Sequence, residues 1–241
     1  MTAGPAGQRW LVTGASRGIG FAIAMAALAG GGRVAFLSRG GTELPAGHDG
    51  RALALRGDVT RPADMQAAAD TLGRQWGGID VLVNNAGLHR GGRVDRIDLA
   101  DFDSVLTTNV SGALNAVRAC LPHFPDEGGA IVNIGAVVGM RGFAGDVAYG
   151  TSKSALSGMT KVLAIELARR AIRVNLVLPG FVSTEMTAEL SAKARERIVE
   201  DIPLRREGTP EEIAQVVWWV AQSPYMTGST IATDGGLMAR L

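Results

Sequence analysis

A tyrosine and a lysine in the second half of the chain have the residue types and the spacing that acid–base chemistry needs. Tyr149 and Lys153 lie four residues apart at the start of a predicted helix, so their side chains should share one helix face. A nearby ammonium favours the phenolate and lowers the pKa of a phenol. The pair could therefore transfer a proton near neutral pH. Because this spacing is common on exposed helices, the hypothesis depends on the motifs around it.

A glycine-rich turn near the N-terminus has the features of a phosphate-binding loop. It spans residues 13–20 (TGASRGIG), follows an apolar run and precedes an alanine-rich segment. Gly14 permits a sharp turn, and Gly18 and Gly20 allow close approach of the backbone. The N–H groups and the positive dipole end of the following helix would bind phosphate. The spacing is G-x-x-x-G-x-G, which differs from the common G-x-G-x-x-G fingerprint.

The residues after the second apolar run discriminate between nucleotides. Proteins that bind NAD usually place Asp or Glu about 20 residues after the glycines, against the ribose 2′-hydroxyl. Here that position is Ser38, followed by Arg39, and the nearest carboxylate is Glu43. A guanidinium grips a 2′-phosphate with two hydrogen bonds, and Arg17 could add a second positive charge. These residues favour NADP(H); the alternative is that both arginines are solvated surface residues.

Short apolar runs alternate with longer helical patterns along the chain. Strands are predicted at 10–13, 34–37, 52–55, 81–83, 131–134, 174–178 and 229–232. Helices are predicted at 18–29, 62–75, 106–120, 149–170 and 211–222. Nearly all strand residues are apolar, which is typical of strands covered on both faces. The alternation predicts a doubly wound α/β fold with a seven-stranded parallel sheet.

The chain is expected to form one domain. We predict a flexible tail at 1–8 and a single domain over 9–241, because no linker or repeat interrupts the pattern. The less regular region 181–209 should help to build the substrate site at the carboxyl ends of the strands.

Composition and charge exclude several classes of protein. Hydrophobic residues are 46% and charged residues 20% of the 241, which is typical of a globular protein. The net charge of +1 gives no support for a nucleic-acid partner. We expect no membrane span, because no apolar run is long enough, and no signal peptide. The single Cys120 excludes an internal disulfide and fits a reducing compartment, so a cytoplasmic location is expected.

The three histidines do not have the spacing of metal ligands. His48, His89 and His123 are scattered along the chain, so we predict no metal site and interpret them as surface or loop residues. His89 directly follows the segment 84–87 (NNAG), which makes it a candidate for bordering a substrate.

Further motifs, taken with the glycine turn and the Tyr149–Lys153 pair, resemble the short-chain dehydrogenase/reductase family from about Trp10 to Gly236. They are Asp58-Val59, 84–87 (NNAG), Asn109, Pro179-Gly180, Thr227-Gly228 and 234–236 (DGG). Within the family the chain is most similar to the 3-oxoacyl-(acyl-carrier-protein) reductase branch, at 134–139 (IGAVVG), 179–186 (PGFVSTEM) and 203–212 (PLRREGTPEE). The resemblance implies one Rossmann-type domain with helices on both faces of the sheet. It also implies an NADPH-dependent reductase that transfers a hydride to a ketone, either a 3-oxoacyl thioester or a similar small carbonyl.

The resemblance implies a role for each matching residue. Tyr149 would give a proton to the substrate oxygen, and Lys153 would hold the nicotinamide ribose and lower the pKa of Tyr149. Asn109 would distort its helix and hold a water that relays protons to Lys153. The implied NADP(H)-binding residues are Gly14, Ser16, Arg17, Gly18, Ile19 and Gly20 at the pyrophosphate and adenosine ribose, Asp58 and Val59 at the adenine, Asn85, Ala86 and Gly87 at the cofactor ribose, and Pro179, Gly180, Val182 and Thr184 at the nicotinamide. Because the family usually forms tetramers, a homotetramer (or dimer) is expected.

The sequence departs from the family at the position of the catalytic serine. The family places that serine 13 residues before the tyrosine, where this chain has Ala136, and no Ser or Thr occurs between Ile134 and Ala148. Loss of such a hydrogen-bond donor costs about 10²–10³ in turnover. Three explanations remain: an engineered serine-to-alanine variant, a natural enzyme whose substrate or a water fills the gap, or an NADP-binding subunit of a reductase assembly with weak or no activity.

A second departure concerns the substrate carrier. Relatives that use an acidic carrier protein have basic residues before the fifth strand, whereas the segment 125–129 here is acidic (PDEGG). Arg170 and Arg173 could still form a small basic patch. This departure favours a free small ketone or a coenzyme A thioester over a carrier-bound substrate.

Overall fold

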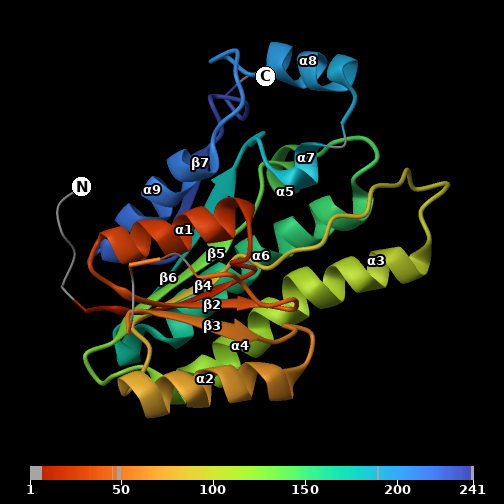
Figure 1. Ribbon diagram of the computed structural model, residues 1–241. Coiled ribbons are helices and arrows are strands. Elements are labelled where there is room, and N and C mark those ends of the chain that lie inside the picture. Colours follow the sequence, from red (N-terminus) through yellow and green to blue (C-terminus); the bar gives the residue numbers. More distant parts are fainter. Residues whose placement is uncertain (1–6, 45, 48–49, 189, 240–241) are drawn as a thin grey trace.

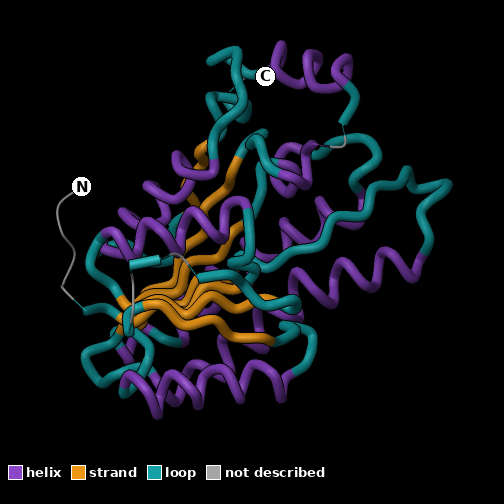
Figure 2. The backbone as a smooth tube through the Cα atoms, viewed as in Figure 1, coloured by secondary structure: helices purple, strands orange, loops and turns teal. Residues whose placement is uncertain are grey.

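A seven-stranded parallel sheet forms the centre of the computed structural model, which describes residues 7–44, 46–47, 50–188 and 190–239 (Figures 1 and 2). The strand order is β3-β2-β1-β4-β5-β6-β7, and every neighbouring pair is parallel. The strands are β1 (Arg9–Thr13), β2 (Arg33–Ser38), β3 (Ala52–Arg56), β4 (Val81–Asn84), β5 (Gly129–Ile134), β6 (Ile172–Pro179) and β7 (Thr230–Thr233). The predicted doubly wound α/β architecture is confirmed, and every predicted strand lies within two residues of an observed one.

Helices cover both faces of the sheet (Figure 1). One layer consists of α1 (Gly18–Ala29) and α9 (Pro210–Gln222), whose buried residues share a core with β1, β2 and β5. The other layer contains α2 (Pro62–Trp76), α4 (Gly112–Cys120) and α6 (Val147–Glu166). Both faces of the central strands are therefore buried, which is why their sequences are nearly all apolar.

The region between β4 and α4 contains more helix than predicted. The predicted helix at 106–120 is preceded by α3 (Leu99–Leu106) and begins with a π-helical turn over Thr107–Ser111. Asp98 starts α3, because its Oδ1 accepts a hydrogen bond from the N–H of Ala100 at 2.8 Å. This N-cap is a local signal that the apolar pattern alone did not reveal.

Short helices surround the carboxyl ends of the strands. These are α5 (Val138–Arg141), α7 (Glu185–Ala188) and α8 (Ala192–Asp201), and Figure 1 shows α8 set apart from the sheet. The last two lie in the region 181–209 that the sequence left without regular structure. The following helix, α9, begins with a capping box between Thr209 and Glu212.

Two residues of the predicted tail are bound to the rest of the chain. The N–H of Gly7 donates to the carbonyl oxygen of Gly31, and Gln222 Nε2 donates to Gln8 Oε1 at 2.6 Å. Residues 1–6 of that tail lie outside the described residues. None of the helices in the described part of the chain has the length and apolar character to cross a membrane.

A stacked tryptophan pair joins the first strand to the last helix. The rings of Trp10 and Trp218 lie 5.2 Å apart at an interplanar angle of 8°, and both are buried. A Cβ at Gly30 would come within 2.2 Å of the Trp218 ring, so only glycine fits at the end of α1. The neighbouring Trp219 is instead 56% exposed.

We predict that Trp218→Ala lowers the free energy of unfolding by about 3–5 kcal/mol, because it empties a buried aromatic site. The matched variant Trp219→Ala should change it by about 0.5 kcal/mol or less, because that ring is mostly solvated. Urea unfolding followed by circular dichroism measures both. Equal losses in the two variants would contradict the packing described here.

Candidate active site

A cavity of about 480 Å³ opens at the carboxyl ends of the strands. It lies where the strand order reverses, between β1 and β4, which is the usual ligand position in open α/β sheets. Every residue predicted to bind the cofactor lines this cavity, and so does Ala136. Asn109 lies behind the wall and is buried. Sequence positions from 14 to 184 are thus brought to one place.

The glycine turn has no room for side chains at two positions. A Cβ at Gly20 would lie 2.3 Å from both the Asn85 amide nitrogen and the Gly14 carbonyl oxygen. Gly14 has a positive φ of 65°, and a Cβ there would lie 2.8 Å from the Cα of Ala86. Arg17 precedes α1 without a capping hydrogen bond from its side chain. The first N–H groups of α1 therefore face the cavity without a side-chain acceptor, and this cradle fits the phosphates of a dinucleotide.

Asn85 and Thr13 join the glycine turn to the loop after β4. The amide of Asn85 donates to the carbonyl oxygens of Thr13 and Gly14, at 3.0 and 3.1 Å. The hydroxyl of Thr13 accepts from the N–H groups of Asn85 and Ala86, each at 3.0 Å. Thr13 was not among the predicted site residues, although its place at the end of the first strand could have indicated a structural role.

Among the described residues, no acidic side chain of β2 or of the loop that follows it lines the cavity. Ser38 Oγ donates to the carbonyl oxygen of Gly41 at 2.7 Å, and Arg39 is exposed on the cavity wall. Burial acts to raise the pKa of Asp58, but hydrogen bonds from Thr60 and the charges of Arg39 and Arg61 outweigh it and lower that pKa. Arg17 forms an exposed ion pair with Glu185 of α7 at 2.8 Å, a partner that the sequence did not indicate. Arg39 therefore leaves its charge at the cavity wall beside the end of β2, whereas the charge of Arg17 is paired with Glu185.

Tyr149 and Lys153 share one face of α6, as their spacing predicted. Lys153 is 4% exposed, its Nζ donates to the carbonyl oxygen of Ile134 at 2.7 Å, and it lies 5.5 Å from the centre of the Tyr149 ring. Burial lowers the pKa of Lys153 to about 8. Burial and the charge of Asp146 raise the pKa of Tyr149, a direction opposite to the expected one. The phenol is therefore held in its protonated form at neutral pH.

Asn109 lies in the π-helical turn and holds two neighbouring segments. Its Oδ1 accepts from the N–H of Leu88 at 2.7 Å, and its Nδ2 donates to the Leu88 carbonyl oxygen and to Ser152 Oγ. The helix is distorted at this residue, as the resemblance implied. Its amide groups thus fix the loop after β4 against α6. Ser152, which was not predicted, donates in turn to the Tyr149 carbonyl oxygen.

Two of the three histidines, all interpreted from the sequence as surface or loop residues, lie in different parts of the fold. His89 Nε2 and Asp146 Oδ1 lie 2.8 Å apart, and the His89 ring contacts the Tyr149 ring. His123 pairs with Asp70 at 3.0 Å on the side of α2. His48 lies outside the described residues. In the described ranges no three His, Cys, Asp or Glu side chains gather as metal ligands.

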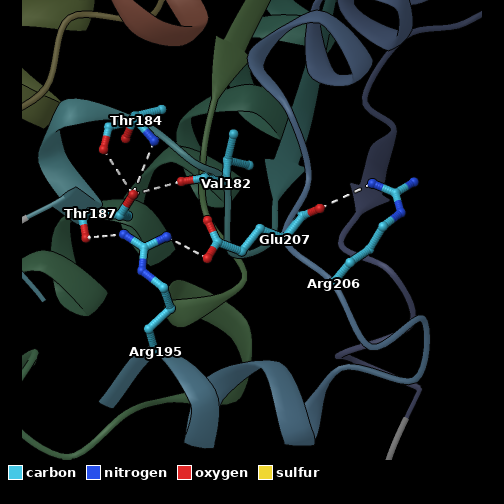
Figure 3. Close-up of polar contacts among 6 residues, drawn as sticks. All are labelled: Val182, Thr184, Thr187, Arg195, Arg206 and Glu207. Carbon is cyan, nitrogen blue, oxygen red and sulfur yellow. Dashed lines mark hydrogen bonds and ion pairs between the residues drawn. The ribbon is translucent and has the colours of Figure 1, made fainter. Parts of the chain in front are cut away.

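The segment after β6 forms another wall of the cavity, and polar contacts hold its shape (Figure 3). Thr187 Oγ1 donates to the Val182 carbonyl oxygen at 2.9 Å and accepts from the N–H of Thr184 at 3.0 Å. Arg195 of α8 donates to the Thr187 carbonyl oxygen and forms an ion pair with Glu207. The two short helices thus brace Val182 and Thr184 at the cavity wall.

The buried Lys153 ammonium should make stability depend on pH. The unfolded chain keeps this lysine protonated up to its ordinary pKa of 10.5, whereas the folded chain releases the proton above about 8. Between these values the unfolded state binds more protons, so the free energy of unfolding rises with pH. Relative to Lys153→Met, the unmodified chain should gain about 2 kcal/mol between pH 7 and 9.5. Chemical denaturation across this range tests it, with Lys161→Met, exposed on the same helix, as control. A constant difference between the two proteins would show that the lysine is not desolvated.

Known proteins resemble this chain over nearly its whole length. The profile of the family described as "Enoyl-(Acyl carrier protein) reductase" matches residues 14–238. Carbonyl reductase family member 4 of Danio rerio is 42% identical, with 94% of this chain and 96% of that protein covered. The 3-oxoacyl-[acyl-carrier-protein] reductase of Homo sapiens is 40% identical, with 94% and 96% covered. A blue fluorescent protein from a metagenomic library, solved in complex with NADPH, superimposes with a TM-score of 0.86 at 34% identity, covering 96% of this chain and 98% of that one.

These matches agree with the sheet order, the glycine turn at the end of β1 and the shared cavity that holds Tyr149 and Lys153. The chain therefore belongs to the short-chain dehydrogenase/reductase family, and it is close to the 3-oxoacyl-(acyl-carrier-protein) reductase branch.

Proposed function

We propose that the protein is an NADPH-dependent reductase that transfers a hydride to a ketone, with Tyr149 as the proton donor. The observation that carries this proposal is the single cavity that combines a phosphate-binding turn, Arg39 and the Tyr149–Lys153 pair. A relative described as a 3-oxoacyl-[acyl-carrier-protein] reductase and a similar structure with bound NADPH support it. The catalytic domain in this proposal spans residues 9–241.

The cavity wall supplies matching groups for each part of NADP(H). In this proposal the glycine turn holds the pyrophosphate, Ser38 and Arg39 bind the 2′-phosphate, and Asp58 with Val59 contacts the adenine. The remaining binding residues are Ser16, Arg17, Ile19, Asn85, Ala86, Gly87, Pro179, Gly180, Val182 and Thr184. A Cβ at Gly180 would lie 2.6 Å from the Cα of Asp234, so glycine at this position lets the cavity wall pack against the segment after β7.

In the proposed reaction, the side chains of the protein deliver a proton to the substrate oxygen. The bound cofactor supplies a hydride for the carbonyl carbon. As negative charge develops on the carbonyl oxygen, the phenol O–H of Tyr149 donates its proton to that oxygen. Lys153, whose pKa lies near 8, can hold or release a proton close to the phenol. Asn109 positions Leu88 and Ser152 around the pair, and its relay to Lys153 through a water stays a prediction.

The proposed substrate is a 3-oxoacyl thioester or a similar small carbonyl compound. The acidic segment 125–129 favours a coenzyme A thioester or a free ketone over an acidic carrier protein. We also propose a homotetramer or dimer, because α6 and α9 leave Val162, Ile165 and Trp219 exposed. A cytoplasmic location fits the single, buried Cys120.

A second candidate function rests on Ala136. Its methyl group lines the cavity where the family has a hydroxyl donor. A chain without that donor could serve as an NADP-binding, weakly active or inactive subunit of a reductase assembly. Both candidate functions predict that the chain binds the cofactor. Only the reductase function predicts appreciable turnover.

The cofactor assignment predicts that Arg39→Asp weakens NADPH binding by about 10²-fold and leaves NADH binding within a few-fold, because only the 2′-phosphate needs the cation. Fluorescence titration with both nucleotides measures this. Arg33→Asp is the matched control, since Arg33 is exposed at the opposite end of the same strand. An equal effect on both nucleotides would refute the 2′-phosphate assignment.

The reductase assignment predicts NADPH oxidation with acetoacetyl-CoA or a panel of small ketones. Tyr149→Phe should lower turnover by at least about 10²-fold while NADPH still binds, because it removes only the proton donor. Ala136→Ser should raise turnover by restoring a hydroxyl. If the chain and its serine variant both leave the whole panel unreduced while they bind NADPH, the subunit function is correct instead.

A further inference from the structure

His89 contacts the proposed proton donor directly. The centres of the His89 and Tyr149 rings lie 5.0 Å apart in an edge-to-face arrangement with an interplanar angle of 78°. His89 follows Leu88, which lines the cavity, and its side chain is 37% exposed. The imidazole is thus held beside the phenol, next to a residue of the cavity wall, and part of it is exposed to solvent. The place of His89 after the segment 84–87 indicates a residue that could border a substrate, but it does not predict the contacts with Tyr149 and Asp146.

Asp146 pairs with the imidazole, although its position at the start of α6 suits a helix cap. Asp146 is the N-cap residue of α6, where an aspartate normally accepts hydrogen bonds from the first turn of the helix. Its carboxylate makes no capping bond and instead lies 2.8 Å from His89 Nε2. The loops that carry both residues are joined, because the N–H of Gly92 donates to the Gly145 carbonyl oxygen at 2.6 Å. The His89–Asp146 pair is therefore fixed to the start of the catalytic helix.

The position at which the family has its serine hydroxyl lines the same cavity. Ala136 is buried at 9% exposure and lines the wall together with Tyr149. Neither it nor any other residue from Ile134 to Ala148 carries a hydroxyl. A substrate carbonyl beside Tyr149 would consequently receive one hydrogen bond from the protein unless another polar side chain reaches it. The His89 imidazole is the polar ring that contacts Tyr149.

We propose that His89, oriented by Asp146, donates a hydrogen bond to the substrate carbonyl oxygen in place of the hydroxyl absent at Ala136. This inference rests on the proposed reductase function and adds a substrate-binding residue to it. With Nε2 directed at Asp146, the other ring nitrogen, Nδ1, has no hydrogen-bond partner among the residues that the structure describes. In the protonated ring both nitrogens carry a hydrogen, so Nδ1 can donate. No bond to the imidazole forms or breaks, because Tyr149 still supplies the proton.

The charge on the protonated ring would also assist the reaction. Hydride transfer places negative charge on the carbonyl oxygen, and a cationic donor held in a fixed position stabilises that charge. Among the described residues, the charged or titratable groups shown in contact with the ring are Asp146 and Tyr149. Lys153 lies 5.5 Å from the centre of the Tyr149 ring, and Arg90, the next residue in the chain, pairs with Asp101 of α3 at 3.6 Å. The carboxylate of Asp146 balances the charge of the ring.

The test combines two substitutions in a cycle. His89→Ala should lower kcat/KM for ketone reduction by about 10²-fold, whereas it should cost less than about threefold when Ala136→Ser is also present, since the serine supplies the same bond. His123→Ala, which removes a histidine paired with Asp70 away from the cavity, should leave kcat/KM unchanged. An unaltered kcat/KM in His89→Ala, or a loss that the serine does not rescue, would overturn the proposal.

The pH profile separates a donor from a structural role. In the unmodified chain kcat/KM should fall as the imidazole loses its proton, and this limb should disappear in the His89→Ala, Ala136→Ser double variant. Asp146→Asn keeps an acceptor for Nε2 but removes the charge, so the limb should move to lower pH. A limb that is identical in all of these proteins would mean that His89 does not donate.

A binding measurement distinguishes failure of this inference from failure of the proposed function. NADPH and a 3-hydroxyacyl-CoA form a complex that cannot react, and NADPH fluorescence reports thioester binding without turnover. His89→Ala should weaken thioester binding by about tenfold and leave NADPH binding intact. If no ketone is reduced but this weakening is found, the reductase function fails and the contact stands. Unweakened binding would refute the contact.

Discussion

The side-chain amide of Asn85 fills the space that two glycines leave open, and the rest of the site depends on this contact. Because Gly14 and Gly20 lack a Cβ, the amide can reach the carbonyl oxygens of the turn. The Thr13 hydroxyl adds a second link between the two loops, because it accepts hydrogen bonds from the N–H groups of Asn85 and Ala86. These contacts fix the loops after β1 and β4, the two strands between which the sheet changes its winding direction. A crevice forms there because neither following connection crosses it.

Two titratable side chains in this crevice, Lys153 and Tyr149, are buried and half-buried, respectively, although their polar groups would be better solvated in water. Lys153 is a nearly buried cation with a single carbonyl partner, and burial lowers its pKa. Tyr149 is kept protonated by burial and by Asp146. An arrangement of this kind costs stability, and perturbed titratable groups gathered in one cleft are typical of functional sites. The sheet and its two helical layers supply the apolar burial that offsets the cost.

Local patterns were sufficient to predict the fold, and the residues they singled out for cofactor binding line one cavity. The apolar runs located all seven strands, and α1 has the predicted bounds Gly18–Ala29, because these features depend on neighbouring residues. Asp98 and the π-helical turn changed the boundaries of the helix near Asn109. Contacts between distant segments were not predictable: Arg17 with Glu185, or His89 with Asp146, 57 residues apart, depend on how loops meet after folding.

The raised pKa of Tyr149 is a second feature that the sequence could not predict. Spacing on a helix predicts that Lys153 is near the phenol, but it says nothing of the burial of either group or of a carboxylate three residues earlier. That carboxylate leaves the first turn of α6 uncapped, which sacrifices about 1 kcal/mol. Proteins break such local rules mainly where function requires another contact. Here the start of α6 lacks a side-chain cap, and its Asp146 holds a histidine against the Tyr149 ring. In the proposed mechanism that histidine, on the loop after β4, supplies the hydrogen bond that Ala136 cannot.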